Sequence, residues 1–205
     1  MAPSTPNPVP DFPEAGHPLV RSLEHLSDSE LLALMQHHPD QGRYFTAIFC
    51  RYGGTLYHLV ANLVAPSQID GLFLWLWESI FAELPQLTLQ PATESPLSSL
   101  QNWLIYTTAL TASQKEITDS LLPANLAIAS PPLRCYLQRG LNQLSPLLRL
   151  TVVMGDYFNW SDKRICAYLQ SEGEVVTEAE IALYRHQGYE QLEATLPPDI
   201  QDIYW

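Results

Sequence analysis

The chain has 205 residues, a formal net charge of −12 and 46% hydrophobic residues. This apolar content is enough to bury a core, so a wholly disordered chain is not expected, and the length fits one domain or two small ones. Ten Lys and Arg stand against 22 Asp and Glu. Such a balance argues against binding of nucleic acid through broad phosphate neutralisation, which needs clustered basic side chains.

The first 26 residues are rich in proline and contain neither a basic nor a long apolar stretch. Six prolines fall within the first 18 residues, which predicts an extended or disordered tail rather than a signal peptide. The long uncharged stretches 52–69 and 95–114 are interrupted by polar residues, glycine or proline. We therefore expect no membrane span and a cytoplasmic protein.

The three cysteines, Cys50, Cys135 and Cys166, are odd in number and far apart. They lack C-x-x-C or Cys/His spacing, which predicts reduced thiols and neither a disulfide framework nor a zinc site. The adjacent His37 and His38 would point about 100° apart on a helix and would ligate a metal poorly together. No phosphate-binding loop, nucleophile elbow, zinc-protease or dinucleotide motif is present. We expect no cofactor, no metal and no enzyme.

Four helices are predicted in the first half of the chain. The first begins at Ser27 or Asp28, residue types that favour helix N-termini. The second covers 42–64, where a Gly53–Gly54 pair is a candidate kink. Its apolar side chains recur at helical spacing: Phe45, Ile48, Phe49, Tyr52, Leu56, Leu59 and Leu63.

The third predicted helix follows Pro66 and covers 67–84. Its residues from Leu72 to Trp77 form an unbroken apolar run. A helix that is apolar on all sides is either deeply buried or partly covered by a partner, and both readings stay open. A proline-containing loop over 85–98 precedes a fourth helix over 99–117.

The second half predicts four more helices, over 134–144, 145–158, 159–170 and 176–196. Nothing alternates convincingly with a period of two residues, so the sequence predicts an all-α protein of two small helical domains joined by a proline-containing linker. The expected organisation is a disordered tail at 1–26, a helical domain at 27–117, a linker at 118–133, a second helical domain at 134–196 and a C-terminal tail at 197–205.

Several motifs occur in a recognisable order. In the first half, Asp28-Ser-Glu-Leu-Leu precedes Tyr44-Phe-Thr-Ala-Ile-Phe-Cys-Arg-Tyr and a helix with Trp103-Leu. In the second half, Leu144-Ser-Pro-Leu-Leu-Arg is followed by Tyr-Phe, Trp-Ser and Ile-Cys-Ala. The run ends in His186-Gln-Gly-Tyr-Glu-Gln-Leu.

This ordered set resembles the sigma-70 family of bacterial RNA polymerase sigma factors, in particular the small extracytoplasmic-function-like type with one sigma-2 and one sigma-4 domain. The resemblance covers about 27–117 and 134–195. It implies a sigma-2-like helical bundle whose third helix docks on polymerase, and a sigma-4-like helix-turn-helix. The candidate partner-binding residues are Asp70, Leu72, Phe73, Leu74, Trp75, Leu76 and Trp77.

The chain departs from the family where the family would face DNA. Across 161–205, three Lys and Arg oppose nine Asp and Glu, a net charge of −6. The segment 103–113 on the promoter-melting helix has no charge, although its aromatic rings could stack on a flipped base. Trp103 could equally be a core residue. The candidate DNA-facing residues are Trp103, Tyr106, Thr177, Glu178, Glu180, Tyr184, Arg185 and Gln187.

The sequence therefore predicts a divergent sigma-70-like protein of transcription that binds RNA polymerase core subunits, or a sigma or anti-sigma factor, through apolar contacts between helices. DNA contact is expected to be weak or to depend on polymerase. One alternative is a sigma-derived interaction or scaffold module with no role in transcription, and another is a functional alternative sigma factor. The aromatic tail Ile203-Tyr-Trp is either a further partner surface or a disordered end.

Overall fold

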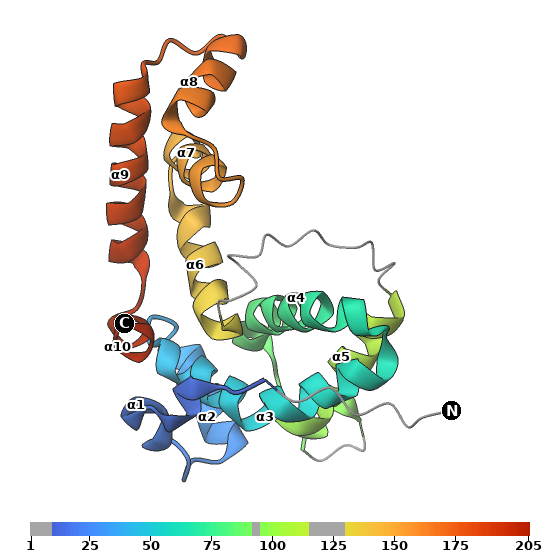
Figure 1. Ribbon diagram of the computed structural model, residues 1–205. Helices are drawn as coiled ribbons and strands as arrows, with labels where there is room; N and C mark the ends of the chain where they lie inside the picture. The colour runs from blue at the N-terminus through green and yellow to red at the C-terminus, as the bar shows by residue number, and fades with distance from the viewer. Residues whose placement is uncertain (1–9, 92–94, 115–129) are drawn as a thin grey trace. The chain divides into compact units, whose positions relative to one another are not determined.

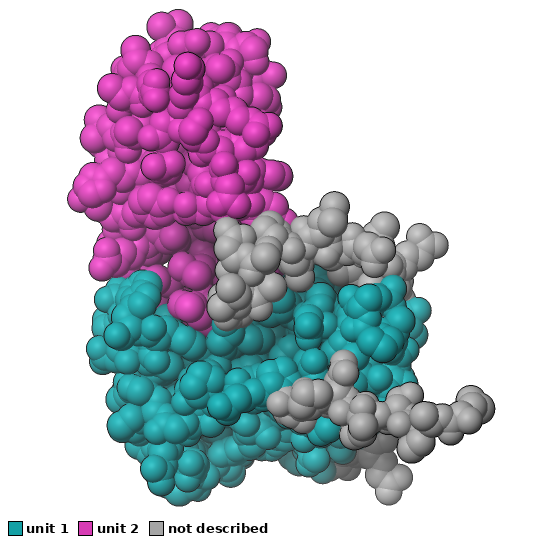
Figure 2. All heavy atoms as spheres, in the orientation of Figure 1, with its two compact units in different colours: residues 1–121, 130–132, 198–205 teal, residues 122–129, 133–197 magenta. Residues whose placement is uncertain are grey.

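The structure, a computed structural model, describes residues 10–91, 95–114 and 130–205. Every regular element in these ranges is a helix, which confirms the predicted all-α class (Figure 1). The chain falls into two compact units, shown separately in Figure 2. Unit 1 comprises 1–121, 130–132 and 198–205, and unit 2 comprises 122–129 and 133–197. Among the described helices, none is long and apolar enough to cross a membrane.

Unit 1 is a helical bundle built around one long central helix. Its main helices are α2 (Asp28–His37), α3 (Gly42–Leu63), α4 (Ile69–Glu83) and α5 (Leu100–Gln114). Short helical turns connect or precede them at η2 (Pro66–Gln68), η3 (Leu84–Gln86) and η4 (Pro96–Ser98). Helix α3 packs against α2, α4 and α5, so its apolar stripe becomes the centre of the core.

Aromatic rings fill that core. Phe49 and Trp77 meet edge to face with ring centroids 4.9 Å apart, and Phe45 lies 5.9 Å from Trp77 in the same geometry. The ring of Phe73 meets Tyr57 at 5.1 Å. Edge-to-face pairs of this kind add to the stability that the buried area already provides.

The N-terminal segment differs from the predicted tail. Residues 10–26 include the helical turns η1 (Pro13–Gly16) and α1 (Pro18–Arg21), while 1–9 lie outside the described residues. The ring of Phe12 lies 4.7 Å from that of Phe49. A Cβ added at Gly53 would come within 3.1 Å of the Phe12 ring. The glycine in α3 therefore gives room for an aromatic side chain from the N-terminal segment.

The C-terminal tail also differs from its prediction, because it forms α10 (Pro198–Tyr204) within unit 1. The carboxylate of Asp199 accepts hydrogen bonds from the backbone N–H groups of Gly42 and Arg43, each at 2.9 Å. Gln41, the residue before α3, makes no side-chain cap. Asp199 thus supplies the missing cap at the positive end of the helix dipole.

A buried polar cluster joins three distant segments of unit 1. The Glu14 side chain is 3% exposed, and its Oε1 accepts hydrogen bonds from the Ser130 hydroxyl and, at 3.2 Å, from the Tyr204 hydroxyl. Burial and then the nearby Glu14 raise the pKa of Tyr204 above its usual range. Burial, with a smaller contribution from Glu14, raises the pKa of the Cys50 thiol to about 12.

Unit 2 is a compact group of four helices. They are α6 (Pro131–Gln143, in unit 2 from residue 133), α7 (Pro146–Asp156), α8 (Asp162–Ser171) and α9 (Glu178–Thr195). A Cβ on Gly188 would lie 2.5 Å from the Val152 Cγ2 atom, so this glycine permits the close approach of α9 to α7. The main core cluster consists of Met154, Ile165, Cys166, Leu169, Val176 and Ile181.

Only the end of the predicted linker, residues 130–133, lies within the described part of the chain. Most of 118–133 lies outside the described residues. Its last residues, Pro131 and Pro132, form the first turn of α6, which therefore begins before the predicted start at residue 134. Proline is well tolerated there, because the first helical N–H groups have no partner within the helix.

Candidate functional site

Helices α8 and α9 form a helix-turn-helix segment with well-defined caps (Figure 1). Ser161 caps α8 by accepting a hydrogen bond from the Arg164 backbone N–H at 3.3 Å. In the turn, Gly173 has a φ of +94°, a conformation that a side chain would disfavour. Val176 is buried beneath the turn and joins the core between the two helices. These local signals fix where α9 begins.

Helix α9 starts with a capping box that uses two of the predicted DNA-facing residues. The Thr177 hydroxyl accepts a hydrogen bond from the Glu180 backbone N–H at 3.3 Å, and the Glu180 carboxylate accepts from the Thr177 backbone N–H at 2.7 Å. The hydrogen bond from the Thr177 side chain and, to a smaller extent, the one from its backbone N–H lower the pKa of Glu180. The first turn of α9 therefore carries fixed negative charge, with Glu178 exposed beside it.

The single Lys or Arg of α9 is held by the protein itself. The Arg185 guanidinium forms an ion pair with Asp162 at 2.8 Å, and both side chains are partly buried. Tyr184 packs against the hydrophobic clusters of unit 2, and Gln187 is half-buried. On the exposed side, His186 and Glu190 lie 3.3 Å apart. Among the predicted DNA-facing residues of α9, the structure places only carboxylates at the exposed N-terminal turn.

The apolar run of α4 is mainly core. Leu72, Phe73, Leu74, Leu76 and Trp77 are buried in unit 1, so these candidate partner-binding residues are covered by the rest of the unit. Trp75 is 39% exposed, and Asp70 lies on the surface. The buried-core reading of the run therefore holds for five of its six residues.

Asp70 has an intramolecular role. It accepts a hydrogen bond from the Tyr57 hydroxyl at 3.0 Å. Burial, then this bond, raise the pKa of Tyr57 to about 12. On α5, Trp103 is buried and cannot stack on a base in this conformation, whereas Tyr106 is 50% exposed. Asp70, Trp75 and Tyr106 are thus the surface positions among the candidates on α4 and α5.

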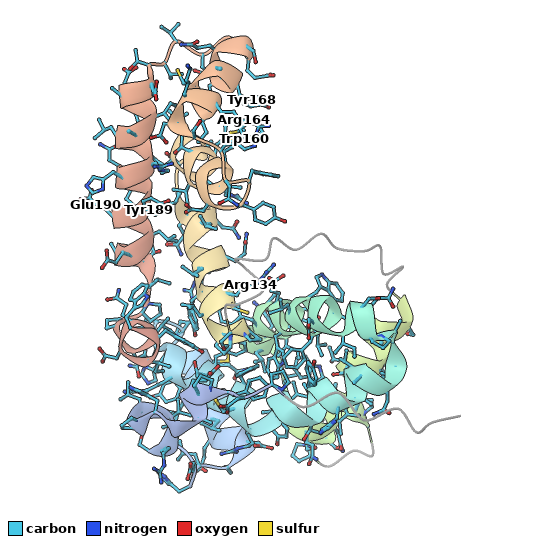
Figure 3. All side chains as sticks on the ribbon, in the orientation of Figure 1. Arg134, Trp160, Arg164, Tyr168, Tyr189 and Glu190 are labelled. Carbon is cyan, nitrogen blue, oxygen red and sulfur yellow. The ribbon has the colours of Figure 1, made fainter. Side chains whose placement is uncertain are left out.

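The structure also shows an aromatic surface that the sequence did not single out. Between α7 and α8, the rings of Tyr157 and Phe158 lie 4.9 Å apart, and that of Trp160 lies 6.1 Å from Phe158 and 5.7 Å from Tyr168. The Arg164 guanidinium lies over the Trp160 ring at 4.1 Å. Figure 3 shows Trp160, Arg164 and Tyr168 together along α8. Their one signal in the sequence is the density of aromatic residues over 157–168.

The charges divide unevenly between the units. Unit 1 has four Lys and Arg against fourteen Asp and Glu, a net charge of −10, and unit 2 has six against eight, a net charge of −2. The charge of −6 counted over 161–205 includes Asp199 and Asp202, which belong to unit 1. Without them, 161–197 has three Lys and Arg against seven Asp and Glu, a net charge of −4.

No protein-family model and no curated protein matches the chain. Within the described ranges, no group of three or more His, Cys, Asp or Glu side chains is placed to hold a metal ion.

Proposed function

We propose that the chain is a divergent sigma-70-like protein of transcription that acts by binding protein, either RNA polymerase core or a sigma or anti-sigma factor. In this proposal its own affinity for promoter duplex is weak. The observation that carries the proposal is the second helix of the helix-turn-helix segment, α9. It begins with Glu178 and the capping Glu180, and its single Lys or Arg, Arg185, is paired with Asp162 within unit 2.

Electrostatics supports the weak affinity for DNA. A recognition helix enters the major groove with its N-terminal residues nearest the bases, and phosphate neutralisation supplies most of the affinity. Here that end of α9 presents carboxylates. Using Arg185 for a phosphate would break its ion pair with Asp162 and leave a partly buried carboxylate without its cation. The carboxylates of α9 and the loss of this ion pair both disfavour the binding of duplex DNA.

Exposed apolar side chains on unit 1 support a protein partner. Trp75 on α4 and Ile105, Tyr106 and Leu110 on α5 are all more than a third exposed. Helix α5 contains no charged residue along its length. Trp and Tyr are enriched among the residues that dominate protein–protein binding energy, so these exposed side chains support a protein partner.

The proposal is tested by co-purification of the tagged full-length protein, with mass spectrometry of what it retains. We expect RNA polymerase subunits or a sigma or anti-sigma factor. A Trp75→Ser variant should retain less of that partner, while Leu63→Ser, which changes another exposed apolar residue of unit 1, should retain as much as the original protein. Recovery of none of these proteins would overturn the proposal.

Run-off transcription distinguishes the remaining sigma-factor alternative. With purified core polymerase and promoter templates, we expect the protein to direct no specific transcript. A specific transcript that depends on the protein would instead identify a functional sigma factor and would contradict the proposed weak promoter recognition.

A further inference from the structure

The aromatic surface of unit 2 described above lies outside the surfaces on which the proposed function rests. We define the aromatic patch as Tyr157, Phe158, Trp160, Arg164 and Tyr168. Phe158 is 55% exposed and Tyr168 is 39% exposed, although both are large apolar side chains. Their rings form a continuous series through Trp160. Large aromatic side chains exposed together mark interaction surfaces more often than single exposed residues do.

The patch is held in place by the backbone beneath it. Asn159 has a φ of +52°, a left-handed conformation that turns the chain sharply between α7 and α8. The Trp160 backbone N–H donates a hydrogen bond to the Met154 carbonyl at 3.0 Å. Trp160 also packs against the buried core of unit 2. Trp160, at the centre of the patch, is therefore held in place before any partner binds, which lowers the entropic cost of binding.

The patch contains one exposed cation, Arg164, and the residue before it in sequence, Lys163, is another. Lys163 and Arg164 are exposed in the first turn of α8, where the helix dipole adds further positive potential. Of the carboxylates nearest in sequence, Asp156 accepts a hydrogen bond from the Tyr189 hydroxyl at 2.6 Å, and Asp162 is paired with Arg185. In the described part of the chain, Lys163 has no ion pair.

We propose that the aromatic patch binds a short acidic peptide segment of a partner protein, with a leucine or aromatic side chain of that segment seated on the rings. The rings would cover the apolar side chain, and Lys163 and Arg164 would pair with flanking carboxylates. Aromatic residues and arginine are the residue types that most often dominate binding energy at protein interfaces. The proposal does not depend on the identity of that partner, and it holds whether or not the partner is part of the transcription machinery.

Charge placement favours a peptide over single-stranded nucleic acid. A single strand needs a groove of cations that follows successive phosphates, together with stacking rings. Here the positive charge is limited to the start of α8, and the turn after α8 carries Glu172 and Glu174. Arg164, which lies over the Trp160 ring, and Lys163, its neighbour in sequence, match one or two carboxylates around an apolar residue.

The test is fluorescence anisotropy of the full-length protein with a labelled synthetic peptide of alternating acidic and leucine or phenylalanine residues. Three probes accompany it: the same peptide with its acids replaced by amides, the same peptide with its apolar residues replaced by serine, and labelled oligothymidylate. We expect saturable binding of the first peptide, with at least about fivefold weaker binding of each of the three others.

Substitutions locate the binding. Arg164→Gln and Phe158→Ser should each weaken binding of the acidic peptide by about fivefold or more. Leu183→Ser, which removes a 51% exposed apolar side chain from α9, and Arg149→Gln, which removes an exposed cation from α7, should change the affinity by less than about twofold. Circular dichroism checks that each variant is folded. If Phe158→Ser does not fold, the result for Arg164→Gln alone tests the proposal.

The proposal would be overturned by no saturable binding of the acidic peptide, by equal binding of its amide counterpart, or by equal weakening by the patch and control substitutions. Tight binding of oligothymidylate that is lost in Arg164→Gln would also overturn it, and would assign the patch to single-stranded nucleic acid.

Discussion

The two units differ more in charge than in architecture. Both are helical, but unit 1 has a net charge of −10 and unit 2 only −2. The acidity of the whole chain is therefore mainly a property of unit 1. In unit 2 the two signs of charge occupy different helices: α9 presents carboxylates at its first turn, whereas α8 begins with the exposed Lys163 and Arg164, and Arg164 lies over the Trp160 ring.

This difference shows that net charge alone is a poor guide to what a surface binds. At physiological salt, interactions between exposed charges fade over about 8 Å, so a partner responds to the charges near its contact and hardly to the total. The following predictions test the comparison of the two units, first through the contacts that stabilise each one and then through their charges.

The largest effect is expected from removing the cap that α10 supplies to α3. Asp199→Ala deletes both hydrogen bonds to the backbone of Gly42 and Arg43, and we expect it to lower the free energy of unfolding by about 2–3 kcal/mol. Urea unfolding measures the loss. Asp202→Ala, an exposed position on the same helix, should stay within about 0.5 kcal/mol of the original protein.

Hydrogen exchange shows whether that loss is confined to unit 1. With Asp199→Ala, we expect faster exchange in α3 and α10 and unchanged exchange in α8 and α9, because the cap lies wholly in unit 1. Equal acceleration in both units would mean that they do not behave as separate bodies.

The matching change in unit 2 is Gly188→Ala. The added Cβ would lie 2.5 Å from Val152 Cγ2, so α9 and α7 must move apart or repack. We expect a destabilisation of about 1–2 kcal/mol by denaturant unfolding, despite the better helix propensity of alanine. Gly16→Ala is the control, since no atom lies within 4 Å of its added Cβ, and it should have little effect. A stabilised Gly188→Ala variant would contradict the close packing described.

Charge placement on α9 is tested by Glu178→Lys. Glu178 is exposed and takes no part in the capping box, so the substitution should cost the helix only about 1 kcal/mol, from the lost interaction of the carboxylate with the helix dipole. We expect weak duplex DNA binding to increase and the log–log salt dependence to steepen by about one unit for the added phosphate contact. The same change at Glu24, an exposed acid of unit 1, should leave DNA binding unaltered. An identical gain in both variants would show that total charge, rather than its place on α9, sets the affinity.

The smallest effect concerns alkaline pH. Tyrosines of the unfolded chain ionise near pH 10, whereas burial and then hydrogen bonds to Asp70 and Asp156 raise the pKa of Tyr57 and of Tyr189 to about 12. Between these values the folded state binds more protons, so the free energy of unfolding falls as pH rises from about 10 to 12. Tyr189→Phe should reduce this slope and remove one late-ionising group from the ultraviolet titration. An unchanged titration would contradict the raised pKa.

Much of the helical pattern could be predicted from the sequence. The apolar stripe of α3, the N-cap Ser27 of α2 and the helices of unit 2 follow from spacing and capping residues that act locally. The roles of the two ends could not be predicted. Phe12 and Asp199 both contact α3, which is remote from them in sequence. The composition of the two terminal segments gives no sign of these contacts.

The candidate surfaces could be predicted less well. An unbroken apolar run in α4 cannot reveal which side chains the bundle covers, and only Trp75 of its six residues is exposed. The acidic start of α9 followed directly from Glu178 and Glu180. The pairing of Arg185 with Asp162 and the assembly of rings around Trp160 depend on how α7, α8 and α9 pack, which periodicity does not specify.

The proposal that this helix-turn-helix unit binds protein rather than DNA can be tested by titrating labelled promoter and random-sequence duplexes with the full-length protein. Fluorescence anisotropy between about 50 and 200 mM salt covers the range in which phosphate contacts change affinity strongly. We expect no binding below micromolar concentrations of protein and no preference for the promoter. Sub-micromolar, promoter-selective binding with a steep salt dependence would contradict the claim.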